Sequence, residues 1–222
     1  MKIDSIILNH INSNTEKEFE AYYIYDSQKI KEQCRIFKNI SYKNKSIHFA
    51  SMANINPHFI KIVKNEGVNI FVNSILHLNT AVEAGFSGQD IIFTSSALSV
   101  KTMKHLERLG VQLNIDSPNQ LKQWMELFPE KTIGIRCNIG DKVKPYSTHA
   151  GFYIGGNSRL GLTTEEIRQI ADKSKIKGLH LYAGTDITDI DYFINCYKIL
   201  IEISDDFPEL EYLNFGGGFG VS

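Results

Sequence analysis

The sequence predicts an α/β protein in which parallel strands alternate with helices and close into a barrel. Short apolar runs rich in β-branched and aromatic residues recur along the chain, and a stretch with helical spacing follows most of them. Most runs are continuously apolar, which is typical of parallel strands buried on both faces. Seven repeats of this rhythm favour a (β/α) barrel over the alternative, a doubly wound sheet.

The expected strands are residues 47–52, 69–73, 90–94, 111–116, 132–137, 177–183 and 211–215. The expected helices are residues 57–66, 75–85, 99–109, 118–127, 164–173 and 189–204. Pro118 after Ser117 suits a first helical turn, and Thr163 with Glu166 resembles a capped helix start. Glycines stand where three helices should end, at Gly67, Gly85 and Gly110.

A complete eight-stranded barrel takes ~250 residues. We therefore expect residues 1–222 to form one barrel domain that is incomplete at the C-terminus and lacks its last βα unit. The first and seventh strands would then have unpaired edges, so we expect a homodimer or a complex with a chain that completes the barrel. The apolar run Ile3 to His10 could also cover part of this gap.

The composition is that of a soluble globular protein, with 42% hydrophobic and 22% charged residues. The formal net charge is -1, from 24 basic and 25 acidic residues, and gives no electrostatic case for nucleic acid or membrane partners. No apolar run reaches the ~18 residues of a membrane span, and the N-terminus does not resemble a secretory signal. These features predict a cytoplasmic protein, and Cys34, Cys137 and Cys196 are expected to be free, mostly buried thiols.

Function in such barrels gathers at the carboxyl ends of the strands. The strongest local signal there is the triplet Gly216 to Gly218 directly after the seventh strand. Consecutive glycines let backbone N–H groups approach an anion, which predicts a phosphate site; a tight turn without ligand is the alternative. Gly184-Thr185 would add donors beside it, and residues 140–158 are expected to form a long loop over the mouth.

Two further side chains stand inside apolar strands. Arg136 is expected to be buried and to need either a ligand anion or a carboxylate of the chain. His180 alternates with Tyr182, so both should point the same way, and a lone strand histidine is more often a core residue than a catalyst. No metal site is predicted.

Several segments, in order, resemble the fold-type III pyridoxal-phosphate (PLP) decarboxylases of the ornithine, diaminopimelate and arginine type. The matching segments are residues 21–26 (AYYIYD), 49–54 (FASMAN), 114–121 (NIDSPNQL), 135–138 (IRCN), 158–161 (SRLG), 178–185 (GLHLYAGT) and 216–220 (GGGFG). The resemblance implies a TIM-type (β/α)8 barrel like that of alanine racemase, without the family's C-terminal β-domain, and a first family strand at 21–26.

Carried over residue by residue, the resemblance implies a phosphate cradle with Thr185 in place of a serine. The implied cofactor-binding residues are Gly216, Gly217, Gly218, Thr185, Arg136, Tyr182, Ala50 and His180. The implied cofactor is PLP, bound non-covalently at most, or phosphate alone.

The catalytic part of the resemblance is missing, so no catalytic residue is assigned. Met52 stands where the family lysine binds the cofactor, and a thioether cannot replace that amine. Tyr182 stands where a histidine stacks on the cofactor ring. The family has two acidic residues in the region that pairs with the nitrogen of the cofactor ring. In this sequence Phe71 and His77 stand at those two positions.

We therefore expect a PLP decarboxylase-like barrel that is inactive alone and serves as a binding, regulatory or partner subunit. The alternative is a truncated or lysine-substituted form of an active diaminopimelate- or ornithine-type decarboxylase. A third hypothesis is a re-purposed pocket in which His180, Tyr182 or His77 acts as acid or base.

Overall fold

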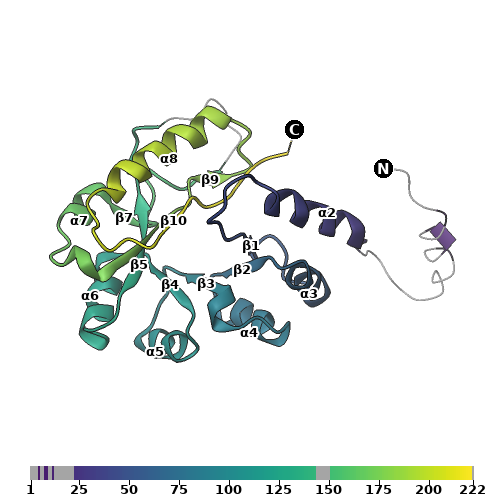
Figure 1. Cartoon of the computed structure of the whole chain (residues 1–222), viewed down its shortest axis with the longest axis horizontal. Helices are drawn as coiled ribbons and strands as arrows, with labels where there is room; N and C mark the ends of the chain where they lie inside the picture. The colour runs from purple at the N-terminus through teal and green to yellow at the C-terminus, as the bar shows by residue number, and fades with distance from the viewer. Residues whose placement is uncertain (1–4, 6–7, 10–11, 13–22, 144–150, 222) are drawn as a thin grey trace.

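The computed structural model describes residues 5, 8–9, 12, 23–143 and 151–221. Its main sheet is parallel and curled, in the order β1-β2-β3-β4-β5-β8-β10 (Figure 1). The strands of this path are β1 (His48–Ala50), β2 (Asn69–Val72), β3 (Ile91–Thr94), β4 (Gln112–Ile115), β5 (Ile133–Asn138), β8 (Ile176–Leu181) and β10 (Tyr212–Asn214). All seven expected strands form, and the barrel-type α/β fold is confirmed.

Three short strands lie beside this path. β7 (Leu162–Thr163) pairs in parallel with β5, while β6 (Gly151–Phe152) pairs antiparallel with β9 (Gly184–Thr185). Part of the long loop expected at 140–158 is therefore a strand, and residues 144–150 of that loop lie outside the described residues. The Ile3 to His10 run also lies mostly outside them.

Helices cover the outside of the curled sheet (Figure 1). They are α3 (Pro57–Asn65), α4 (Ile75–Glu83), α5 (Val100–Arg108), α6 (Pro118–Leu127), α7 (Thr164–Arg168) and α8 (Ile190–Ser204), while α2 (Ser27–Lys38) lies at the open side of the sheet (Figure 1). The expected signals act as predicted: the Ser117 hydroxyl caps α6, and Thr163 with Glu166 forms a capping box. Gly67, Gly85 and Gly110 follow helix ends at φ +70°, +91° and +68°, which only glycine adopts freely.

Three expectations are corrected. Helix α2 was not predicted; it begins because the Asp26 carboxylate accepts from the N–H groups of Gln28 and Lys29. The first family strand implied at 21–26 does not form over residues 23–26, the part the structure describes. Helix α7 ends at Arg168 rather than near 173, because Asp172 accepts from the Ser174 N–H and starts a separate 3-10 turn.

The hydrophobic core lies between the outer face of the sheet and the helices. It contains residues from every layer, among them Ile60, Leu78, Phe93, Leu106, Ile115, Trp124, Ile135, Leu179, Cys196 and Leu200. Strands β3 and β5 are buried along their whole length, as their continuous apolar runs predicted. All three cysteines are free, with Cys137 and Cys196 buried and Cys34 partly so.

The Tyr212 ring lies on the inner side of the curled sheet. Tyr212 on β10 reaches β4, where its hydroxyl lies 2.7 Å from Asn114 Oδ1. A Cβ atom added at Gly178 would lie 1.8 Å from the Tyr212 ring, and one at Gly134 would lie 2.1 Å from its hydroxyl. These two glycines therefore make room for the ring, and the contact from β10 to β4 spans the interior of the barrel.

The sheet is open on one side. Within the described residues, neither β1 nor β10 has a strand on its outer edge. Helix α2 lies on this side, close to the last part of the chain (Figure 1), where Phe37 stacks against Phe219 with ring centroids 6.4 Å apart. Arg35 of α2 is tied to Glu66 after α3 by a bond of 3.0 Å.

Candidate binding site at the barrel mouth

A buried ion pair forms the floor of the barrel mouth, at the carboxyl ends of the strands. Arg136 Nη1 on β5 lies 3.3 Å from Asp116 Oδ1, directly after β4. The two residues are 8% and 2% exposed. Asp116 also accepts from the Ser96 hydroxyl and, at 3.0 Å, from the Gly161 N–H. The partner that Arg136 was expected to need is therefore a carboxylate of the chain itself.

Gln120 fixes the strand ends around this pair. Its Oε1 accepts from the Asp116 N–H at 3.0 Å, and its Nε2 donates to the carbonyls of Ser95 and Ser96 at 3.0 Å each. One side chain in the first turn of α6 thus holds the ends of β3 and β4 together. A network in which every member is paired is rigid, and losing one member leaves a buried group unsatisfied.

One nitrogen of Arg136 has no partner in the described part of the chain. Arg136 Nη2 is buried and makes no hydrogen bond. The same is true of Nδ1 of His180, which pairs with Arg136 in the register of β5 and β8. Burial and the nearby Arg136 charge lower the pKa of His180 to about 3, so this imidazole is neutral at neutral pH. A buried unpaired donor costs about 1–3 kcal/mol, so an acceptor at this point would be bound favourably.

The glycine triplet forms a tight turn against the end of β8. Gly216 and Gly218 have φ +72° and +93°. Added Cβ atoms would lie 2.1 Å from the Leu181 carbonyl oxygen and 1.8 Å from that of Gly184. A Cβ at Gly217 would meet nothing within 4 Å, so this backbone faces open space.

The donors of the turn are only partly used. Gly216 N–H donates to Asn214 Oδ1 at 2.9 Å. The N–H groups of Gly217 and Gly218 donate to no residue that the structure describes. Two backbone donors at an open turn are the arrangement that binds oxyanions.

Tyr182 and Thr185 lie beside this turn. Burial raises the pKa of Tyr182, and a hydrogen bond with Thr185 partly offsets this. Arg136 Cζ lies 5.6 Å from the Tyr182 ring centroid, and the Tyr153 ring stacks on Tyr182 at 5.2 Å and 13°. His180 and Tyr182 therefore both meet Arg136, as their alternation along β8 predicted.

The β1 side of the mouth is built differently. Ala50 ends β1 opposite Phe71 of β2, whose ring lies 5.2 Å from that of His180. Ser51 is buried, with its Oγ 2.7 Å from His77 Nδ1. Met52 is 45% exposed.

Most predicted residues thus meet at one end of the barrel. Three others in the network were not predicted as site residues: Gln120, Gly161 and Tyr153. Asp116 ends the expected strand 111–116, where function was expected to gather, but it was not predicted as the partner of Arg136. Tyr153 gave no signal, since it lies in the segment without periodicity.

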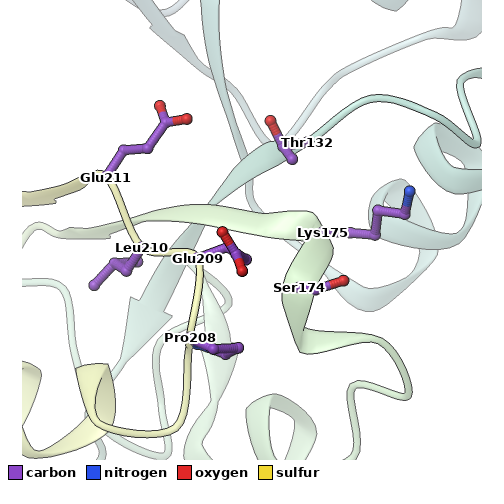
Figure 2. A pocket seen from close by; sticks show the side chains of 7 residues that line it. All are labelled: Thr132, Ser174, Lys175, Pro208, Glu209, Leu210 and Glu211. Carbon is purple, nitrogen blue, oxygen red and sulfur yellow. The ribbon is translucent and has the colours of Figure 1, made fainter.

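Elsewhere the surface is hollowed at the opposite end of the barrel. A depression of about 490 Å³ opens beside the starts of β5, β8 and β10 (Figure 2). It is lined by Thr132, Ser174, Lys175, Pro208, Glu209, Leu210 and Glu211.

Over the described residues no helix is long and apolar enough to cross a membrane, and no three His, Cys, Asp or Glu side chains are grouped to hold a metal.

The fold and this mouth match a known family. The sequence pattern of the family described as "Pyridoxal-dependent decarboxylase, pyridoxal binding domain" matches residues 27–222. The chain belongs to this family. It is 27% identical over 216 residues to a diaminopimelate decarboxylase of Methanothermobacter thermautotrophicus, covering 90% of this chain and 49% of that protein. The chain spans about half the length of the curated relatives it matches.

Solved structures share the fold. A crystal structure of diaminopimelate decarboxylase superposes with a TM-score of 0.82 at 21% identity, over 100% of this chain and 53% of that one. The lysine/ornithine decarboxylase of Vibrio vulnificus, complexed with putrescine, gives a TM-score of 0.79 at 18% identity, over 99% and 59%. These likenesses show the barrel fold of PLP-dependent decarboxylases.

The residues at the mouth fit the phosphate group of the family cofactor but not its covalent attachment to the protein. The free N–H groups at Gly217 and Gly218, with Thr185 beside them, fit a phosphate group. The end of β1 does not fit covalent attachment of the cofactor, because the Met52 thioether has no amine. No lysine stands at residues 50–54, 114–117, 136–138, 182–185 or 214–220.

Proposed function

We propose that this chain is a PLP decarboxylase-type barrel of the diaminopimelate type that binds a phosphate-bearing ligand non-covalently and does not decarboxylate amino acids by itself. Met52 at the end of β1 carries this proposal. PLP acts as an electron sink only when the protein presents it correctly to the substrate. A barrel that binds phosphate without a lysine suits a binding, regulatory or partner role.

Reduction of a PLP-treated sample tests the missing covalent bond. We expect borohydride treatment followed by intact-mass and peptide analysis to give only scattered, substoichiometric labelling of surface lysines. Stoichiometric label on one lysine near the mouth, for example Lys142 in the loop after β5, would overturn the proposal. It would favour the second candidate, an active amino-acid decarboxylase with a displaced lysine.

Thermal unfolding tests the phosphate site separately. Phosphate should raise the melting temperature, because a ligand at 100 times its Kd stabilises the folded state by about 2.7 kcal/mol. Gly217→Glu places a negative charge beside the free N–H groups and should abolish the shift. Gly217→Ala should retain it, since an added Cβ meets nothing within 4 Å. No shift with wild type at millimolar phosphate would contradict the site.

The open sheet supports a proposal about partners. The outer edges of β1 and β10 are unpaired in the described residues, and unpaired edges recruit further strands. We expect light scattering on the 222-residue chain to give a dimer or larger species. A soluble monomer that unfolds cooperatively at high micromolar concentration would show that the edges need no partner.

A further inference from the structure

The aromatic rings around the phosphate site are already paired with rings of the protein. Three aromatic side chains flank the glycine turn and Thr185: Tyr182, Phe215 and Phe219. Tyr153 stacks on Tyr182 at 5.2 Å. Phe215 packs on Tyr197 of α8 at 4.8 Å, and Phe219 packs on Phe193 of α8 at 4.9 Å.

Tyr153 is held in place by the backbone on both sides of it. The preceding residues form β6, which pairs with β9. The Tyr153 N–H donates to the Ala183 carbonyl at 3.1 Å, and its own carbonyl accepts from the Ser158 hydroxyl at 2.7 Å. The Tyr153 ring therefore lies on Tyr182 next to the antiparallel pairing of β6 with β9.

An aromatic ligand at this site would need a ring face to stack on. Near-parallel aromatic pairs gain energy beyond burial of their area, so an incoming ring competes with the Tyr153–Tyr182 pair. It would have to displace Tyr153, and with it the β6–β9 pairing, or the Arg136 guanidinium from the same Tyr182 ring. A ligand without a ring meets no such competition.

We propose that Tyr153 sets the ligand class of the mouth: the site takes phosphate and phosphate monoesters without an aromatic ring, and discriminates against ring-bearing phosphates. This inference rests on the phosphate site of the proposed function and adds the selection among phosphates. The phosphate would be held by the free N–H groups of Gly217 and Gly218. The unpaired Arg136 Nη2, more than nine-tenths buried, offers a further donor at the floor of the mouth.

Competition binding with two probes tests the inference. Inorganic phosphate is the ring-free probe, and pyridoxamine 5'-phosphate is the ring-bearing one, which has no aldehyde and cannot label lysines. Calorimetry should show that wild type binds pyridoxamine phosphate at least about tenfold more weakly than phosphate, because the ring must displace Tyr153 or Arg136 from Tyr182. Tyr153→Ala exposes the Tyr182 face and should tighten pyridoxamine phosphate about tenfold while leaving phosphate unchanged.

Tyr153→Phe is the matched control, because it retains the stacked ring and loses only the hydroxyl. It should behave as wild type. If wild type binds pyridoxamine phosphate as tightly as phosphate or more tightly, or if Tyr153→Ala does not tighten that binding, Tyr153 does not exclude a ligand ring and the inference is wrong while the phosphate site stands. If neither probe binds wild type, the phosphate site itself fails, and the proposed function fails with it.

Discussion

The two sides of the barrel mouth differ in what their residues do for the fold. On the β8–β10 side, Gly216 and Gly218 are fixed by positive φ and by backbone carbonyls that leave no room for a Cβ. On the β1 side, Met52 is nearly half exposed. The glycine turn is therefore part of the folded backbone, whereas covalent chemistry at the β1 side would depend on one exposed side chain.

This difference explains how a barrel can keep a binding geometry without its chemistry. Any replacement of Gly218 must deform the turn that joins β10 to the end of β8. Met52 is 45% exposed, so a replacement at position 52 meets no comparable steric constraint. Because the glycine turn is needed for the fold itself, selection for stability alone would retain its geometry.

The largest expected change in the free energy of unfolding comes from the buried Asp116–Arg136 pair, which lies between the two sides of the mouth. Asp116→Ala should lower the free energy of unfolding by about 3–5 kcal/mol, because it leaves the buried Arg136 without its carboxylate. Urea unfolding measures this. The double variant Asp116→Ala/Arg136→Met removes both charges and should recover part of the loss. A loss below about 1 kcal/mol for the single variant would mean that the pair does not hold the mouth together.

The second test compares the two sides directly. Gly218→Ala should cost about 3 kcal/mol, since its Cβ would lie 1.8 Å from the Gly184 oxygen at φ +93°. Met52→Ala, a far larger change in side-chain volume, should cost less than about 1 kcal/mol because the side chain is 45% exposed. Equal losses in urea unfolding would remove the distinction between the sides.

Much of the fold could be predicted from the sequence, because its signals are local. The apolar runs predicted every strand of the main sheet. Serines at helix starts and glycines at helix ends predicted where several helices begin and end. Helix α2 was missed because its signal is weak: it buries no residue, and it begins at a single aspartate cap. The predicted helix at 164–173 is longer than α7 because the apolar spacing continues past Arg168. The structure instead has a separate 3-10 turn that begins after Asp172.

The site was less predictable because its contacts cross strands. The glycine turn and Arg136 could be found from residue type and position alone. The pairing of Asp116 with Arg136 depends on the register of β4 against β5, and the Tyr153–Tyr182 stack depends on the antiparallel pairing of β6 with β9. Neither register is encoded within a single segment.

A smaller effect should appear on acidification, at the histidine between the two sides. His180 contacts Phe71 of β2, and a hydrogen bond with Asn214 of β10 partly opposes its lowered pKa. That pKa falls from 6.5 to about 3, so below pH 6.5 the unfolded chain binds a proton that the folded chain does not. Stability is full above pH 6.5 and falls as the pH drops toward 3, by ~2 kcal/mol between pH 7 and pH 5.

Urea unfolding at pH 7, 6 and 5 measures this loss. His180→Leu should reduce the slope; some slope should remain, because burial also lowers the pKa of His48. An unchanged slope in His180→Leu would show that His180 does not carry the acid sensitivity of the mouth.

The smallest expected effect is on phosphate affinity and concerns Asp186, an acidic residue beside the glycine turn. Asp186 follows Thr185 and lies against the end of the glycine turn, where an added Cβ at Gly220 would be 3.1 Å from Asp186 Oδ1. Its φ of +57° is one that asparagine also adopts, so Asp186→Asn should keep the backbone. Removing this exposed charge should tighten phosphate binding about two- to fivefold at low salt, and less at 0.5 M salt because exposed charges are screened. Glu202→Gln, on the exposed face of α8, is the matched control and should change nothing. An affinity for phosphate that is the same in wild type and Asp186→Asn at low salt would place the bound anion away from the glycine turn.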